Sequence, residues 1–298
     1  MLRAPRGPLR AMDGLNRVSC STLAPVSIDF ADPQAAAELA AEHIRTTLLT
    51  PSGLDHVDIV MVLGSGWNQG TDQLGDEIAT VDLGTVPGFS KPVVVGHGGS
   101  LRIARTATGK VTMILTGRTH FYEGRGVEPV VHGVRTAAAL GAEICVLTNG
   151  CGGLDPAWAP GTPVLIGDHI NLTGATPLRG ATFIDMSEAY SPRLMALARE
   201  VEPGLPDGVY VQFTGPNYET PAEVRMAGIL GGSLVGMSTA IETIAAREAG
   251  LQVLGISLVT NAAAGLGEEN LDHSEVLAAG TAAGPRLTGL LQGILAKL

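Results

Sequence analysis

The chain has 298 residues, of which 45% are hydrophobic but only 4% aromatic, and its formal net charge is −10 at pH 7. This composition provides a large aliphatic core. It argues against a general nucleic-acid binder, because such proteins carry a basic stripe and none follows residue 17. No apolar run reaches the roughly 18 residues that a membrane-spanning helix requires, so neither nucleic acid nor membrane is expected as a partner.

The N-terminal segment is rich in arginine and poor in acidic residues, and it lacks the apolar stretch of a secretory signal. We interpret residues 1–24 as a flexible N-terminal extension ahead of one domain at 25–298. The three cysteines, Cys20, Cys145 and Cys151, fit no metal-binding spacing. A reduced, cytoplasmic location is therefore expected.

Strands and helices are predicted to alternate along the chain. Asp32-Pro33 combines an N-cap with a proline in the first turn, and a helix is predicted through Ala35–Leu49. Strands are predicted at Val57–Leu63, Val111–Thr116, Ile144–Thr148, Val164–Ile166, Val209–Phe213, Leu234–Met237 and Leu251–Val259. Further helices are predicted at Pro129–Leu140, Pro192–Glu200, Pro221–Leu230, Ile241–Glu248 and Ser274–Leu295. Several strands are continuously apolar, which favours an α/β fold: a three-layer α/β/α single domain with a central mixed β-sheet.

Polar and glycine-rich sequences follow most of the predicted strands, where α/β sheets bind their ligands. Gly64-Ser65-Gly66 can present backbone amides and a hydroxyl to an anion, and it can equally be a tight turn. It lacks the third glycine of the dinucleotide fingerprint, because Gln69 stands there. Arg118 and His120 follow an apolar strand two residues apart. A guanidinium grips phosphate in a two-pronged manner and histidine adds a donor, so the pair indicates an anion site.

A second group of residues suits a planar base. Thr220-Pro221-Ala222-Glu223 is a capping box, which accounts for Glu223. Glu219 is left outside that helix beside Tyr218, where an aromatic ring can stack on a base while the carboxylate accepts ring N–H protons. The seven histidines form no zinc signature and no Ser-His-Asp triad is evident, so metal and serine-hydrolase chemistry are not expected.

Taken in order, these sequences resemble the purine nucleoside phosphorylases of the trimeric class, particularly its bacterial members. The resemblance runs from about residue 30 to the C-terminus. Besides the segments above, it rests on Tyr122-Glu123-Gly124, Thr148-Asn149, Gly152-Gly153, Asp168-His169-Ile170-Asn171, Gly215-Pro216, Gly236-Met237-Ser238-Thr239, Thr260-Asn261 and Glu275–Gly280. It implies the nucleoside phosphorylase fold and a homotrimer. It also implies a reaction in which inorganic phosphate is the cosubstrate and no cofactor is needed.

The resemblance also implies roles for matching positions. Phosphate would be held by Ser65, Arg118, His120, Ser238 and the backbone N–H of Gly150, where the family usually has alanine. Ribose would contact His97, Tyr122, Met237 and His273, with Phe183 reaching in from a neighbouring subunit. The purine would contact Tyr210, Tyr218, Glu219 and Asn261. The catalytic residues would be His120, Glu219 and Asn261.

The expected substrates are inosine, guanosine and their deoxy forms, cleaved to the free base and (deoxy)ribose 1-phosphate in purine salvage. An ionised Glu219 accepts a hydrogen bond from N1–H of a 6-oxopurine, whereas N1 of adenine carries no hydrogen. Two alternatives remain. A methylthioadenosine phosphorylase is disfavoured by His273 and by Asn261, where those enzymes have aspartate. A non-catalytic purine- or anion-binding protein on the same scaffold would be expected to lack Glu219, Asn261 or His120.

Overall fold

A computed structural model describes residues 28–90, 99–267 and 273–298. The predicted N-terminal extension and His97 lie outside these residues. So does the segment directly before His273, and the side chain of His273 itself is not described.

The strands form one nine-stranded mixed sheet in the order β2-β3-β4-β1-β5-β8-β7-β6-β9, and β5 also pairs with β9. The strands are β1 (Ile59–Val62), β2 (Asp76–Asp82), β3 (Ser100–Arg105), β4 (Val111–Leu115), β5 (Ile144–Gly153), β6 (Pro163–Asn171), β7 (Asp207–Gln212), β8 (Leu234–Gly236) and β9 (Gln252–Ala262). Because β5 bonds to β1, β8 and β9, one half of the sheet closes into a ring of pairings while the other half stays open. The predicted mixed α/β sheet is confirmed.

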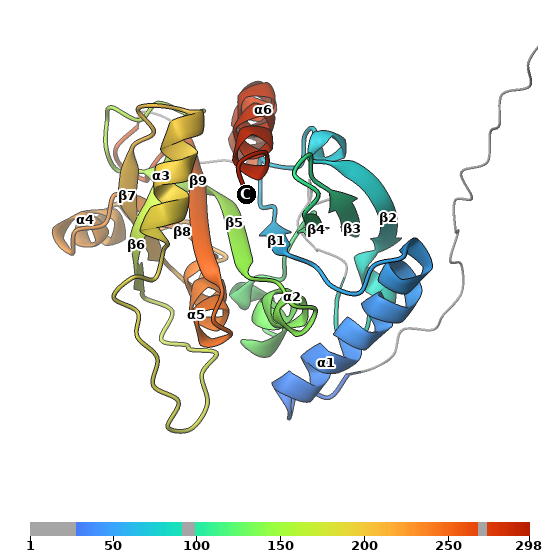
Figure 1. Ribbon diagram of the computed structural model, residues 1–298. Helices are drawn as coiled ribbons and strands as arrows, with labels where there is room; N and C mark the ends of the chain where they lie inside the picture. The colour runs from blue at the N-terminus through green and yellow to red at the C-terminus, as the bar shows by residue number, and fades with distance from the viewer. Residues whose placement is uncertain (1–27, 91–98, 268–272) are drawn as a thin grey trace, which may run out of the picture.

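Helices cover both faces of the sheet (Figure 1). α1 (Pro33–Ile44), α2 (Glu128–Ala139) and α5 (Ala240–Glu248) lie together on one face, and α3 (Pro192–Val201) and α6 (His273–Leu295) lie on the other. α4 (Pro221–Ile229) stands at the edge beside β7. Within the described residues, no helix is long and apolar enough to cross a bilayer.

Alternation along β1 shows why the strand is continuously apolar. Val60 and Val62 pack into the core cluster under α1 and α2, whereas Ile59 and Met61 pack into the cluster that contains α3 and α6 residues. Successive side chains of a strand point to opposite faces. A strand covered on both sides therefore needs apolar residues at every position, as predicted.

Helix starts follow the sequence signals. The Asp32 side chain accepts hydrogen bonds from the backbone N–H groups of Gln34 and Ala35 and so caps α1, which continues as a π-helix over Arg45–Leu49. The capping box that opens α4 is also present, with Thr220 and Glu223 bonded reciprocally. Both predictions are confirmed.

Two parts of the strand prediction are wrong. β2 and β3 are missing from the predicted strands, because neither forms an apolar run: β2 is exposed or half-buried throughout, and in β3 polar residues interrupt the apolar ones. The predicted strands Ile144–Thr148 and Leu251–Val259 end too early, because Asn149-Gly150 and Thr260-Asn261 lie inside β5 and β9. These two strands stay paired as far as Gly153 and Ala262, with an irregularity between Cys151 and Gly152.

Candidate active site

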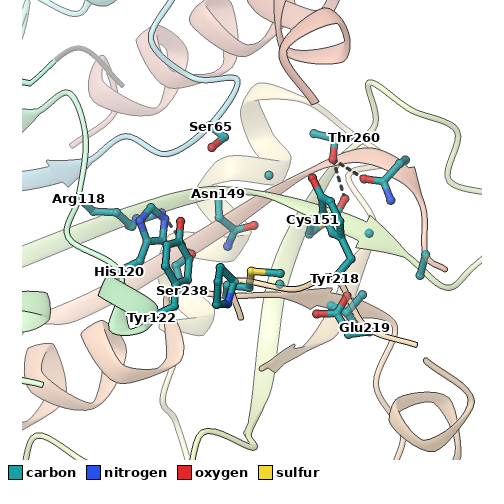
Figure 2. A pocket seen from close by; sticks show the side chains of 18 residues that line it. Ser65, Arg118, His120, Tyr122, Asn149, Cys151, Tyr218, Glu219, Ser238 and Thr260 are labelled. Atoms are coloured by element: carbon teal, nitrogen blue, oxygen red, sulfur yellow. Dashed lines mark hydrogen bonds between the residues drawn. The ribbon is translucent and has the colours of Figure 1, made fainter. Parts of the chain in front are cut away.

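A cavity of about 320 Å³ lies where β5, β8 and β9 meet the segments that follow β1, β4 and β7. Of the residues predicted to bind phosphate, Ser65, Arg118, His120, Gly150 and Ser238 all line it. Of those predicted to bind ribose or base, Tyr122, Tyr218, Glu219, Met237 and Asn261 line it. Figure 2 shows Arg118, His120 and Ser238 at one end of this cavity and Tyr218 and Glu219 at the other. Residues far apart in the chain thus form one pocket with an anion end and a base end.

Arg118 is a buried cation in the wall of the anion end, with its side chain only 2% exposed. Its Nε donates to Oε1 of Glu242 at 3.2 Å, and its Nη1 donates to the carbonyl oxygen of Thr148 at 2.6 Å. Longer bonds run from Nη1 to Ser238 Oγ at 3.4 Å and from Nη2 to the carbonyl oxygen of Val62 at 3.5 Å. Protein acceptors therefore fix the guanidinium. To bind an anion through both Nη groups, Arg118 must break its two longest hydrogen bonds, to Ser238 Oγ and to the carbonyl oxygen of Val62.

Glycines of the pocket wall allow this close packing. A Cβ at Gly64 would lie 2.6 Å from the carbonyl oxygen of Thr148 and 2.7 Å from Nη1 of Arg118. A side chain there would push apart the two groups that hydrogen-bond to each other. At Gly150 a Cβ would lie 3.4 Å from the backbone oxygen of Ser65, so the two predicted phosphate contacts are neighbours in the wall.

His120 and Tyr122 stack on each other, with ring centroids 4.7 Å apart and an angle of 11° between the planes. A 3₁₀ turn over Phe121–Glu123 holds them, and Oε1 of Glu123 accepts from the backbone N–H of His120 at 2.7 Å. Burial alone would raise the pKa of Glu123, but hydrogen bonds from His120 outweigh it and lower that pKa. Burial raises the pKa of Tyr122 to about 12, so its hydroxyl keeps its proton and can donate to a ligand.

Glu219 faces the base end of the cavity. The residue is 7% exposed, and its Oε1 has no hydrogen-bond partner within residues 28–90, 99–267 and 273–298. Burial raises the pKa of this carboxyl. A buried carboxylate oxygen without a partner is costly, so the base end holds an acceptor ready for a ligand N–H.

Asn261 lies near the end of β9 on the same cavity. Its Oδ1 accepts from the hydroxyl of Thr260 at 2.8 Å, and its Nδ2 donates to the carbonyl oxygen of Ala262 at 2.9 Å. An amide nitrogen carries two hydrogens and an amide oxygen has two lone pairs. Together, these two bonds leave one further N–H on Nδ2 and one further lone pair on Oδ1 for a ligand.

Two predicted site residues lie elsewhere. Tyr210 is fully buried in the core and does not line the cavity, so its prediction as a base contact needs correction. Its hydroxyl instead accepts from the backbone N–H of Ser238 at 3.3 Å, behind the wall. Phe183 stands outside the cavity and is 92% exposed, on the segment between β6 and α3.

Two residues near the anion end received no role from the sequence. Asn149 lines the cavity, its Nδ2 donates to Thr239 Oγ1 at 2.9 Å, and its buried Oδ1 has no hydrogen-bond partner in the described part of the chain. Glu242 holds Arg118 from behind. In the sequence, Asn149 is next to Gly150, a predicted phosphate contact. That adjacent position is the sequence signal that could have identified it. A local pattern marks Glu242 as the acid of a capping box that starts at Thr239, but nothing local indicates its contact with Arg118, which is 124 positions away.

A sequence model of the phosphorylase superfamily matches residues 58–296, and the chain belongs to that superfamily. The purine nucleoside phosphorylase of Cellulomonas sp is 55% identical over 275 residues, covering 91% of this chain and 96% of the relative. That of Mycobacterium tuberculosis is 48% identical over 268 residues, covering 90% and 100%. The crystal structure of the Schistosoma mansoni enzyme with inosine has a TM-score of 0.78 at 33% identity, covering 89% of this chain and 96% of that one.

These comparisons confirm the resemblance seen in the motifs. The activity is that of a purine nucleoside phosphorylase, a transferase. In the part of the chain that the structure describes, no group of three or more His, Cys, Asp or Glu side chains is placed to hold a metal ion.

Proposed function

We propose that the chain cleaves the N-glycosidic bond of inosine, guanosine and their deoxy forms with inorganic phosphate, in purine salvage. The products are the free 6-oxopurine and (deoxy)ribose 1-phosphate. The observation that carries this proposal is that one cavity joins an anion end, at Arg118, to a base end where Oε1 of Glu219 has no hydrogen-bond partner among the described residues. Solved Schistosoma purine nucleoside phosphorylases in complex with inosine, guanosine and hypoxanthine support it.

In the proposed reaction, a phosphate oxygen attacks the anomeric carbon while the bond to the purine breaks. The electron pair of that bond goes to the departing base, and the sugar passes through a cation-like state.

Donors already in place where charge develops contribute most to such catalysis. Asn261 donates to N7 as electrons arrive there, and Glu219 accepts from N1–H. Arg118, His120, Ser65, Ser238 and the backbone N–H of Gly150 hold the phosphate. Tyr218 stacks on the base, and Tyr122 and Met237 contact the ribose.

The same residues decide between base classes. An ionised Glu219 matches the N1–H of hypoxanthine or guanine but repels the lone pair on N1 of adenine. The remaining N–H of the Asn261 amide can donate to N7 or be shared with O6, both of which are acceptors in a 6-oxopurine. A site built around a hydrogen bond rejects an analogue that cannot make it by about 10⁴-fold in favourable cases. The arrangement therefore favours 6-oxopurines over adenosine and methylthioadenosine.

The proposal is tested by incubating the protein with inosine, adenosine or methylthioadenosine, each with and without phosphate, and measuring the free base. Inosine cleavage is expected only with phosphate, and adenosine and methylthioadenosine are expected to react far more slowly. Cleavage of inosine that is independent of phosphate would contradict the phosphorylase. Adenosine turnover as fast as that of inosine would contradict the base assignment alone.

We further propose a homotrimer in which Phe183 completes the neighbouring subunit's ribose site. Its 92% exposure within one subunit supports this, because a large apolar side chain gains most from burial by a partner. The expected cytoplasmic location fits Cys145 and Cys151, which are free thiols. His97 and His273 remain proposed ribose contacts from the family resemblance.

Mixed trimers test the role of Phe183. The variants Phe183→Ala and Glu219→Ala are each expected to lose most activity as homotrimers. Co-expressed, they are expected to recover part of it, because a site with Glu219 on one subunit can receive Phe183 from the next. Inosine phosphorolysis by the purified mixture measures the recovery, and separately purified variants mixed without subunit exchange serve as the control. No recovery in verified mixed trimers would mean that Phe183 does not act across subunits.

A further inference from the structure

Glu242 lies behind the anion end of the cavity and is not among the residues that line it. It stands in the first turn of α5, and its side chain is only 1% exposed. Both of its oxygens are used. Oε1 accepts from Nε of Arg118 at 3.2 Å, and Oε2 accepts from the backbone N–H of Thr239 at 2.9 Å. One carboxylate therefore joins a side chain that follows β4 to the turn between β8 and α5.

The turn held by Glu242 is strained. Thr239 has φ 80° and ψ −52°, and within the described residues no other residue except glycine has a positive φ. The backbone N–H of Ala240 donates to the carbonyl oxygen of Ser238 at 3.0 Å, which makes residues 238–240 a γ-turn of the rare, strained hand. A β-branched residue adopts such a conformation only where its surroundings enforce it.

The contacts that enforce this turn come from the anion end of the site. Besides the bond from Thr239 N–H to Glu242, Thr239 Oγ1 accepts from Asn149 Nδ2 at 2.9 Å and lies 3.1 Å from Ser238 Oγ. Ser238 N–H donates to the hydroxyl of Tyr210. The turn thus fixes the position of Ser238, whose Oγ is also within 3.4 Å of Nη1 of Arg118.

We propose that Glu242 is a positioning residue for phosphate: it holds Arg118 and the Ser238 turn as one rigid unit. This inference rests on the proposed function, because it concerns the phosphate end of that same site. Glu242 touches no substrate in this arrangement. It holds the guanidinium through Nε, which keeps Nη1 within 3.4 Å of Ser238 Oγ, and it holds the γ-turn through Oε2. Misplacing a binding group by about 1 Å can cost roughly 100-fold in activity.

Position and charge make opposite predictions for this residue. The negative charge of the Glu242 carboxylate offsets the positive charge of Arg118. If Glu242 acted through its charge alone, it would therefore weaken phosphate binding. Removing that negative charge would then strengthen the binding of a phosphate dianion. A positioning role predicts the reverse, because a released guanidinium and a relaxed turn no longer converge on one anion. The sign of the change in phosphate KM therefore separates the two roles.

The test is Glu242→Gln, which keeps the shape but loses the charge. A glutamine amide can accept from Thr239 N–H, but its NH₂ group cannot accept from Nε of Arg118. Phosphate KM is expected to rise about 10- to 100-fold, while inosine KM at saturating phosphate stays within about twofold. The increase in melting temperature that phosphate gives the unmodified protein is expected to be lost.

Glu248→Gln provides the matched control. Glu248 stands on the same helix, and its Oε2 accepts from Nη2 of Arg135 at 2.6 Å, away from the cavity. Breaking this ion pair is expected to lower the melting temperature but to leave phosphate KM unchanged. If Glu242→Gln fails to fold, Glu242→Asp retracts the carboxylate while keeping its charge, and the same rise in phosphate KM is expected.

Each possible result either supports or overturns the positioning role of Glu242. An unchanged or lowered phosphate KM in a folded Glu242 variant overturns the inference, and so does an equal rise in Glu248→Gln. Failure of the unmodified protein to cleave inosine with phosphate would instead overturn the proposed function. A rise in phosphate KM confined to the Glu242 variants supports the positioning role.

Discussion

Glu219→Ala is expected to lower kcat/KM for inosine by about 10³-fold. The carboxylate is buried at the base end, and no hydrogen-bond donor among the described residues reaches its Oε1. The N1–H of the bound purine can therefore donate to it. Removing the carboxylate takes away the acceptor that orients the purine in the cavity, with N7 against Asn261. The loss should therefore appear in kcat as well as in KM. Steady-state phosphorolysis of inosine at saturating phosphate measures it, and phosphate KM is the internal control that should stay near its original value.

The acid side of the pH profile tests the same carboxylate. Burial raises the pKa of Glu219 above the ordinary value of a glutamate. The protonated acid is a weaker acceptor for N1–H because it has lost its charge, so activity falls as the pH falls through this raised pKa and is full above it. The acid limb of kcat/KM for inosine should accordingly lie at higher pH than an ordinary glutamate would place it. Glu219→Gln should lack that limb; a limb that persists unchanged would assign it to another group.

How far the sequence predicts this site depends on where each signal lies in the chain. Glu219 could be singled out because the local capping box explains Glu223 and leaves Glu219 without a role. Arg118 could be singled out because it follows an apolar strand at the point where α/β sheets bind ligands. In both cases a few neighbouring residues carry the information, and the structure brings both residues to one cavity.

The residues that support the site could not be found in this way. Glu242 meets Arg118 across 124 positions, and Tyr210 meets Ser238 across 28. The parallel pairing of β7 with β8, in which Tyr210 is opposite Leu234, brings Tyr210 behind Ser238, and these two strands belong to the ring of pairings that closes through β6, β9 and β5. That closure was not predicted either, because it depends on β5 pairing with β8 and β9 at once, and no local pattern encodes the choice of partner.

Asn261→Asp is expected to lower kcat/KM for inosine by about 100-fold or more and to raise activity toward adenosine relative to inosine. The amide at this position bonds to Thr260 and Ala262 and still has a hydrogen to offer the purine. Aspartate keeps the acceptor from Thr260 but has no hydrogen for N7, and its charge opposes the negative charge that grows on the departing base. A 6-amino group, in contrast, can donate to the new carboxylate.

Asn261→Ala is the matched control: it also loses the N7 donor, but it gains no acceptor for an amino group. Its activity should fall on both nucleosides, and the adenosine-to-inosine ratio should rise less than in Asn261→Asp. Parallel kcat/KM measurements on inosine and adenosine decide the matter, and an adenosine-to-inosine ratio equal in Asn261→Asp and Asn261→Ala would show that Asn261 does not read the 6-position.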